Sequence, residues 1–181
     1  GDVYKRQDFG LDVTVEHEGK TLCIPIALAG TFQAVNAVTA AVIAHASGLP
    51  LHDSLWALPY VTGAEGRMQL VPGHPTGARV VVDYAHTPDA LESALKALRP
   101  ETRGRLAVVF GAGGDRDAGK RPMMGSTAHQ HADIVYVTDD NPRSEDASAI
   151  RTAIIESCPN AIEIPDRGDA IASAMRELDA D

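Results

Sequence analysis

Residues 134–143 read IVYVTDDNPR, an apolar run followed directly by two carboxylates, an amide, a proline and an arginine. The run 134–137 is typical of a strand that is buried on both faces. Pro142 prevents a helix from starting early, so the charged residues form a loop at the end of the strand. The arginine suits a carboxylate ligand, and the acids and amide suit an ammonium. A solvated loop before a helix would show the same composition.

An apolar strand followed by a helix recurs on both sides of this segment. Strands are expected at residues 80–82, 106–110, 134–137 and 161–164. Helices are expected from Pro88 onward and at residues 122–131, 147–157 and 169–178. Repeated β-α units with unbroken apolar strands predict a parallel sheet covered by helices on both faces. The predicted fold class is therefore α/β, a Rossmann-like domain with a mostly parallel sheet.

The first third of the chain has a different, α+β character. A hairpin and two helices are expected there, over residues 13–28, 31–47 and 51–58. The hairpin turn is placed at Gly19-Lys20, and Gly48 suits the end of the longer helix. Glycine and proline are dense between Gly63 and Gly77, so we place a domain boundary in that interval.

Both ends of the sequence look interrupted. Residues 1–7 (GDVYKRQ) show no helix cap and no periodicity, so we expect them to be non-native or disordered. The sequence stops at Asp181, just after a predicted helix and before the strand expected to follow it. We therefore expect a piece of a longer protein.

Composition limits the kinds of partner. The 181 residues are 44% hydrophobic and 23% charged, which is ordinary for a soluble globular protein. The net charge of −9 argues against a nucleic-acid or anionic-membrane surface. No apolar stretch approaches the roughly 18 residues of a membrane span. Cys23 and Cys158 are far apart in sequence, which favours two buried thiols in a reducing cytosol and a cytoplasmic location.

Four strand ends carry the polar residues, at 83–86, 111–117, 139–143 and 165–167. Ligands in parallel sheets bind outside the carboxyl ends of the strands. Three of these segments are crowded with charge. We therefore expect them to converge on one functional rim.

Several motifs near this rim also have ordinary explanations. The turn Gly111–Gly114 suits either close approach of a ligand or a tight strand-to-helix turn. Lys120-Arg121 would either attract an anion at a helix start or form a solvated basic pair. Gly114 to Lys120 resembles the start of a phosphate loop, but Arg121 replaces its Ser or Thr, so we reject that interpretation. His129 and His131 are expected to be solvated. Asp83, His86 and Asp89 could suggest a metal or acid-base set, but their spacing matches no metal site.

Several of these segments together resemble the Mur ligase family. They are GTFQAVN at 30–36, GRM at 66–68, VDYAHTPDAL at 82–91, FGAGGDRDAGKRPMM at 110–124 and DNPR at 140–143. The resemblance extends over about residues 10–181 and is greatest to members that add diaminopimelate. It implies that residues 8–63 are the end of a central ATP-binding domain. Residues 64–181 would then be a C-terminal Rossmann-like domain, truncated at its end.

The resemblance implies an ATP-dependent ligase of peptidoglycan precursor synthesis. ATP, with Mg²⁺, would phosphorylate the carboxylate of UDP-N-acetylmuramoyl-L-alanyl-D-glutamate, and the amine of meso-diaminopimelate would attack the acyl phosphate. ATP and Mg²⁺ would be bound mainly by residues upstream of this sequence. We therefore expect no catalytic or metal-binding residue here, no activity of this piece alone, and a monomeric enzyme.

The resemblance also implies roles for individual residues. The positions matching those that bind diaminopimelate are Arg116, Asp140, Asn141, Pro142 and Arg143. The positions matching those that line the nucleotide are Asn36, Arg67, Asp83 and His86. Arg143 would recognise the distal carboxylate of diaminopimelate, which lysine lacks. Two alternatives remain open: a Mur ligase for another amino acid, and a non-catalytic, anion-binding Rossmann-like module.

Overall fold

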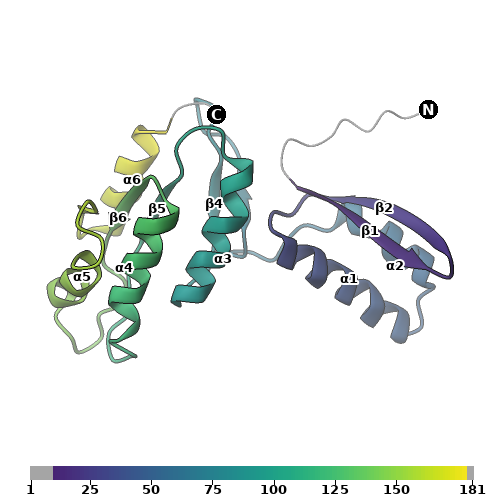
Figure 1. The fold of residues 1–181 in the computed structure, drawn as a ribbon, viewed down its shortest axis with the longest axis horizontal. Helices are drawn as coiled ribbons and strands as arrows, with labels where there is room; N and C mark the ends of the chain where they lie inside the picture. The colour runs from purple at the N-terminus through teal and green to yellow at the C-terminus, as the bar shows by residue number, and fades with distance from the viewer. Residues whose placement is uncertain (1–9, 179–181) are drawn as a thin grey trace. The chain divides into compact units, whose positions relative to one another are not determined.

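The computed structural model describes residues 10–178, and these divide into two compact units. The first unit ends at Gln69 and the second begins at Leu70. The division falls inside the predicted boundary interval of residues 63–77. Residues 1–7, expected to be non-native or disordered, lie outside the described residues. Figure 1 shows the ribbon of both units, each of which is described by itself below.

The first unit is a hairpin packed against helices, as predicted. Its elements are β1 (Leu11–His17), β2 (Lys20–Ile26), α1 (Thr31–Ala46), α2 (Leu51–Trp56) and the short 3₁₀ helix η1 (Leu58–Tyr60). The strands are antiparallel, with Leu11 opposite Ile26. The turn is formed by Glu18 and Gly19, both with positive φ (48° and 74°), one residue earlier than predicted. Two left-handed residues match the twist of a two-residue hairpin.

The second unit contains alternating strands and helices, and the first of its strands begins at Gln69, the last residue of the first unit. They are β3 (Gln69–Val71), β4 (Val80–Val82), α3 (Pro88–Leu98), the 3₁₀ helix η2 (Arg99–Glu101), β5 (Ala107–Phe110), α4 (Lys120–His131), β6 (Ile134–Val137), α5 (Ala147–Ile155), β7 (Ile162–Glu163) and α6 (Arg167–Arg176). Strands β5, β6 and β7 form a parallel sheet in that order, which confirms the α/β prediction. The first of the four strands predicted for the parallel sheet, β4, is instead hydrogen-bonded to β3. Strand β3 lies in the Gly- and Pro-rich segment for which the sequence predicts only a domain boundary.

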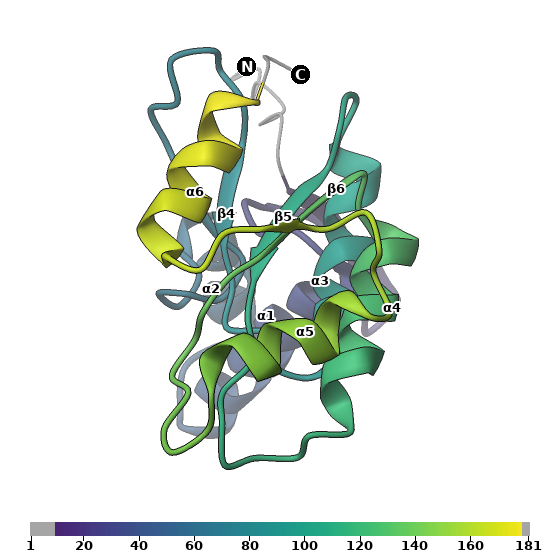
Figure 2. The ribbon, with the colours of Figure 1, turned by 90° about the vertical axis from the view of Figure 1, so that its left-hand side faces the viewer.

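Helices cover both faces of this parallel sheet. One core joins α3, α4 and α5 to the sheet through residues such as Leu95, Met124, Val135, Val137 and Ile154. Because side chains alternate along a strand, the buried Tyr136 points to the other face. That face is covered by α6, which contacts β5 and β6 and lies across the sheet from α3 and α4 in Figure 2.

Two helices of the second unit begin two residues earlier than predicted. Helix α6 starts at Arg167 because the Asp166 carboxylate caps it, accepting a hydrogen bond from the Asp169 N–H at 2.9 Å. Helix α4 starts at Lys120 with no side-chain cap. The sequence therefore contains no capping residue that would mark the start of α4.

The two cysteines lie in different environments. Cys158 is buried, and this burial raises the pKa of its thiol. Cys23 is exposed, because it occupies an outward-facing position of β2 between half-buried Leu22 and buried Ile24. The prediction of two buried thiols was therefore wrong for Cys23. None of the helices within residues 10–178 combines the length and apolarity that crossing a membrane requires.

Candidate functional site

The loops at the carboxyl ends of β5, β6 and β7 are joined by hydrogen bonds. The Gly114 N–H donates to the carbonyl oxygen of Asn141 at 2.9 Å. The Thr138 hydroxyl and the Asp139 N–H each donate to the carbonyl oxygen of Pro165 at 3.0 Å. The loop before α3 is connected to the start of α4, since the Lys120 ammonium donates to the carbonyl oxygen of His86 at 3.0 Å. The polar strand ends therefore form one rim.

The glycines of the Gly111–Gly114 turn make room for the neighbouring loop. None of them has positive φ, so the turn does not need their conformational freedom. A Cβ on Gly111 or Gly114 would overlap the carbonyl oxygen of Thr138 or Pro142, respectively. A Cβ on Gly113 would lie 2.9 Å from an Nη atom of Arg143. These glycines therefore permit close approach, but of the chain's own loop rather than of a ligand.

Arg143 is held in a left-handed conformation by its neighbours. Its φ is 51°, which costs a non-glycine residue about 1–2 kcal/mol. The Arg143 N–H donates to the Asn141 side-chain oxygen at 3.2 Å, and one Nη donates to the Gly114 carbonyl oxygen at 2.6 Å. Because Arg143 is exposed and this bond uses only part of its guanidinium, other N–H groups remain available to an anion. Arg116, on the facing turn, is also exposed.

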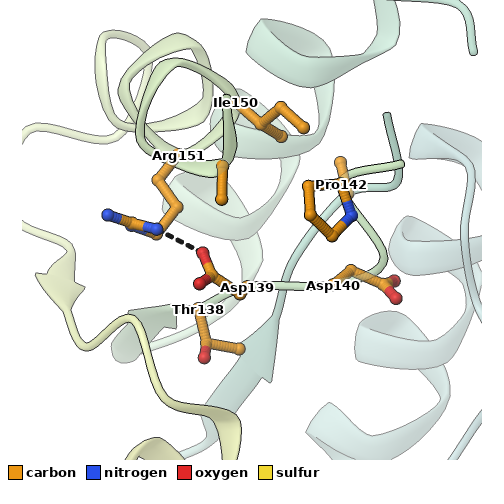
Figure 3. A pocket seen from close by; sticks show the side chains of 8 residues that line it. Thr138, Asp139, Asp140, Pro142, Ile150 and Arg151 are labelled. Atoms are coloured by element: carbon orange, nitrogen blue, oxygen red, sulfur yellow. Dashed lines mark hydrogen bonds and ion pairs between the residues drawn. The ribbon is translucent and has the colours of Figure 1, made fainter. Parts of the chain in front are cut away.

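The two aspartates of the loop have different surroundings. The Asp139 carboxylate forms an ion pair with Arg151, whereas Figure 3 shows the Asp140 carboxylate pointing away from Arg151. Arg151 is buried and also donates from Nε to Glu163 at 2.7 Å. The hydrogen bond to Glu163, together with the bond to Asp139, raises the pKa of Arg151 above its ordinary value, although burial of the guanidinium acts in the opposite direction. Asp139 therefore anchors the loop, and Asp140 stays exposed, 3.7 Å from Arg167.

Arg151 is not among the residues predicted from the sequence to belong to the site. One signal was present: it is the only charged residue in the α5 sequence ASAIRTAII. Beside it lies a small open hollow of about 150 Å³, lined by Ala112, Thr138, Asp139, Asp140, Pro142, Ala147, Ile150 and Arg151 (Figure 3). This volume includes open solvent, and the hollow encloses no space for a water molecule. The candidate site is therefore the exposed rim with Arg116 and Arg143, not this hollow.

Some basic residues expected to be solvated form ion pairs instead. Arg121 is only 5% exposed, and one Nη donates to the Glu145 carboxylate at 2.7 Å. It is thus neither an anion site nor part of a solvated pair, and Glu145 is a second residue that the sequence analysis missed. Arg121, followed by the Asp115 N–H, holds the pKa of Glu145 below its ordinary value of 4.5. His131 is also half-buried, with Nε2 3.4 Å from the Glu92 carboxylate, while His129 is exposed as predicted.

The residues predicted to line a nucleotide are divided between the two units. Asn36 and Arg67 are exposed in the first unit, and Asn36 donates to the Gln33 side chain at 3.0 Å. Asp83 and His86 are exposed in the second unit, in the loop before α3. Within residues 10–178, no group of three or more His, Cys, Asp or Glu side chains is placed to hold a metal ion.

Comparison with known proteins supplies the family. A family model described as "Mur ligase, glutamate ligase domain" matches residues 66–181. The chain is 52% identical over 166 residues to the UDP-N-acetylmuramoyl-L-alanyl-D-glutamate--2,6-diaminopimelate ligase of Chelativorans sp. (strain BNC1), covering 92% of the chain and 34% of the relative. It is 51% identical over 171 residues to the Bradyrhizobium diazoefficiens protein of the same name, covering 94% and 35%. The chain therefore spans about a third of the length of the curated relatives it matches.

Solved structures agree with this match. A structure of UDP-N-acetylmuramoyl-L-alanyl-D-glutamate--2,6-diaminopimelate ligase is similar with a TM-score of 0.63 and 36% identity, covering 92% of this chain and 35% of that one. The Mycobacterium tuberculosis folylpolyglutamate synthase complexed with ADP is similar with a TM-score of 0.67 and 25% identity, covering 91% and 39%. MurF from Acinetobacter baumannii, at 17% identity and a TM-score of 0.71, shares the fold, covering 95% of this chain and 36% of that one.

Proposed function

The chain belongs to the Mur ligase family, and from this membership we propose that it is part of a ligase that adds meso-diaminopimelate to UDP-N-acetylmuramoyl-L-alanyl-D-glutamate. One observation carries the proposal: the loop bearing Arg143 is interlocked with the turn bearing Arg116 at the carboxyl edge of the sheet. Two exposed guanidinium groups are thereby presented on adjoining loops. The names of relatives about half identical to the chain agree with this substrate.

The chemistry of diaminopimelate fits these side chains. It has an amino-acid group at each end, so it presents two carboxylates and two ammonium groups. Arg116 and Arg143 would each bind one carboxylate, and Arg143 would take the distal one. The oxygen atoms of Asp140 and Asn141 would accept hydrogen bonds from an ammonium, with Pro142 restricting the loop between them and Arg143. Lysine would leave Arg143 without its carboxylate partner.

The reaction would be amide-bond formation driven by ATP, which is consistent with family relatives whose structures contain ADP. We propose that Asn36, Arg67, Asp83 and His86 line the nucleotide. The described residues offer no cluster of carboxylates that would hold Mg²⁺. From the family resemblance, we propose that residues outside this sequence bind the metal and most of the ATP, and we assign no catalytic residue to this chain.

The remaining proposals concern domains and setting. We propose that residues 8–63 form the end of a central ATP-binding domain and residues 64–181 a C-terminal amino-acid-binding domain. This portion alone would be inactive, because one domain would hold ATP while the other holds the amino acid. The whole enzyme would act as a monomer in the cytoplasm.

The test uses the protein at the full length of its relatives. ADP release is measured with the UDP-linked muramoyl dipeptide and either meso-diaminopimelate or L-lysine, for the wild type and Arg143→Ala. We expect turnover only with diaminopimelate. In Arg143→Ala, kcat/KM for diaminopimelate should fall about a hundredfold, because a charge-assisted pair is lost from the substrate.

Arg103→Ala is the matched control, because Arg103 is also an exposed arginine of the second unit. It should leave kcat/KM unchanged. Equal use of lysine by the wild type would instead favour a Mur ligase for another amino acid. A folded full-length protein without amino-acid-dependent turnover would favour a non-catalytic, anion-binding module.

A further inference from the structure

Glu145 connects two loops and a helix at the candidate site. Its Oε1 accepts one hydrogen bond from the Asp115 N–H at 2.6 Å and another from an Nη of Arg121 at 2.7 Å. Asp115 belongs to the glycine-rich turn, Arg121 to the first turn of α4, and Glu145 to the segment just before α5. One carboxylate oxygen thus holds together three segments that are separate in sequence.

Other bonds reinforce the same junction. The Asp115 carboxylate accepts from the Ser144 hydroxyl at 2.6 Å and from the Ser144 N–H at 3.2 Å. Arg143, the preceding residue, donates to the Gly114 carbonyl oxygen at 2.6 Å. Asp115 and Arg143 both have a φ of 51°, so a strained residue lies on each side of the junction. We name the set Asp115, Arg121, Ser144 and Glu145 the loop clamp.

The burial of Arg121 is difficult to explain by stability alone. A buried ion pair recovers little of its desolvation cost, and apolar residues of similar volume often stabilise a protein more. The Arg121 side chain is 6% exposed, and its Nε is buried with no hydrogen-bond partner in the described part of the chain. Such an unsatisfied donor adds to the cost. An apolar side chain of similar volume would avoid this cost, which makes the guanidinium a candidate for a role beyond stability.

The position of the clamp suggests that purpose. Arg116 directly follows Asp115, and Arg143 directly precedes Ser144. Asp115 and Ser144, which bond to each other, are therefore the chain neighbours of the two arginines proposed to bind carboxylates. Fixing Asp115 against Ser144 and Glu145 limits how far Arg116 and Arg143 can move apart.

We propose that Arg121 and Glu145 are positioning residues that set the spacing between Arg116 and Arg143, and so select an amino acid with two carboxylates at the separation found in diaminopimelate. This inference rests on the proposed function and extends it to residues that need not touch the substrate. It makes the spacing of two cations, as well as the presence of Arg143, a determinant of specificity.

The test compares two carboxylates with the same kinds of partner. Asp133 also accepts from one arginine, Arg99 at 2.6 Å, and from one backbone N–H, that of Leu106 at 2.7 Å. It lies before β6, at the opposite end of that strand from the site. Asp133→Asn is therefore the control for Glu145→Gln, Glu145→Ala and Arg121→Lys, all made in the full-length protein. Thermal stability, KM for each substrate and kcat are measured for every variant.

We expect Glu145→Ala to raise KM for meso-diaminopimelate by about ten- to a hundredfold, with KM for ATP within about twofold of wild type. Glu145→Gln keeps an oxygen that can accept from the Asp115 N–H, so its KM should rise less than that of Glu145→Ala. Arg121→Lys keeps the charge but not the planar guanidinium. Its KM for diaminopimelate should also lie between those of the wild type and Glu145→Ala. Asp133→Asn should lower the melting temperature while leaving KM for diaminopimelate unchanged.

Each outcome decides between the two proposals. If the wild type turns over diaminopimelate but the Glu145 and Arg121 variants change only stability, as Asp133→Asn does, the positioning role is wrong and the proposed function stands. If the folded wild type shows no diaminopimelate-dependent ADP release, the proposed function fails, and the positioning role fails with it. Glu145→Gln and Arg121→Lys keep the test decisive should Glu145→Ala not fold.

Discussion

Two carboxylates connect the loops at opposite ends of β5 and β6, through the same kinds of hydrogen bond. At the amino end, Asp133 accepts from Arg99 and from the N–H of Leu106. At the carboxyl end, Glu145 accepts from Arg121 and from an N–H of the glycine-rich turn. The Arg99 side chain is 41% exposed, whereas that of Arg121 is 6% exposed. The same bonding pattern therefore uses a solvent-exposed arginine at the amino end and a buried arginine at the carboxyl end, whereas the two carboxylates are similarly exposed.

The backbone separates the two ends more clearly. Asp115 and Arg143 at the carboxyl end have positive φ, and Gly114 lies against the Pro142 carbonyl. At the amino end, Arg99 has an ordinary helical conformation with φ −55°. Backbone strain in proteins gathers at functional sites, where the surrounding structure holds it in place. The two ends therefore share their hydrogen-bond chemistry, and it is strain and close packing that distinguish the end proposed to bind the amino acid.

The largest expected effect tests the close packing at the carboxyl end. Gly114→Ala should lower the free energy of unfolding of the second unit by about 4 kcal/mol, because its Cβ would overlap the Pro142 carbonyl oxygen. Gly73→Ala is the control: Gly73 has φ 97° and nothing near its Cβ position, so it should cost only about 1 kcal/mol. Urea unfolding followed by circular dichroism measures both. Equal losses would show that the two loops are not held closely together.

A smaller effect tests the backbone strain at Arg143. The difference in stability between a glycine and an alanine variant should have opposite signs at Arg143 and at Arg99. Arg143→Gly should be about 1 kcal/mol more stable than Arg143→Ala, because glycine adopts φ 51° without strain. Arg99→Gly should be about 1 kcal/mol less stable than Arg99→Ala, because Arg99 is in the helical region. Both variants in each pair lack the guanidinium, so the two differ mainly in the conformational preference of the backbone. The same sign at both ends in urea unfolding would rule out strain at Arg143.

The smallest expected effect is on the free energy of unfolding at acid pH. Hydrogen bonds from the Leu106 N–H and Arg99 hold the pKa of Asp133 below its ordinary 3.8, and those from Arg121 and Asp115 hold that of Glu145 below 4.5. The folded state thus favours both carboxylates, so their stabilisation is present above these ordinary values. It is lost as pH falls through the lowered pKa values.

Unfolding free energies measured between pH 6 and pH 3 check this pH dependence. Asp133→Asn and Glu145→Gln should each make the decline below about pH 4.5 less steep. The double variant should show the sum of both changes, because distant sites with no shared partner are additive. A steeper decline in either variant would contradict the assigned direction of the pKa shift.

Most of the fold was predictable because the strands and helices carry their own local signals. The apolar runs of β5 and β6, the proline that opens α3 and the glycine after α1 each act within a few residues. The pairing of β4 with β3 was not predictable in this way. Three residues in a Gly- and Pro-rich segment carry no periodicity, and only tertiary contacts make them a strand.

The site was predictable in its location but less so in its internal bonds. Charge at successive strand ends indicated one rim, and the rim forms. The partners of Asp139 and Arg121 were not predictable, because Arg151 and Glu145 come from other segments of the chain. The requirement for glycine at positions 111 and 114 was not predictable either, because it comes from the loop that packs against them. The roles of Arg116 and Arg143 in binding an amino acid stay predictions until the kinetic tests.

The different exposure of the two cysteines provides an internal reporter of opening. A maleimide reagent should modify Cys23 at once, because that thiol faces solvent in the first unit. Cys158 is shielded in the core of the second unit and should react only when that core transiently opens. With two cysteines in the sequence, a mass spectrum resolves singly from doubly labelled chains. At a reagent concentration high enough for reaction to outpace reclosing, the rate of the second addition gives the opening rate of the second unit, and the first addition marks the start of the reaction.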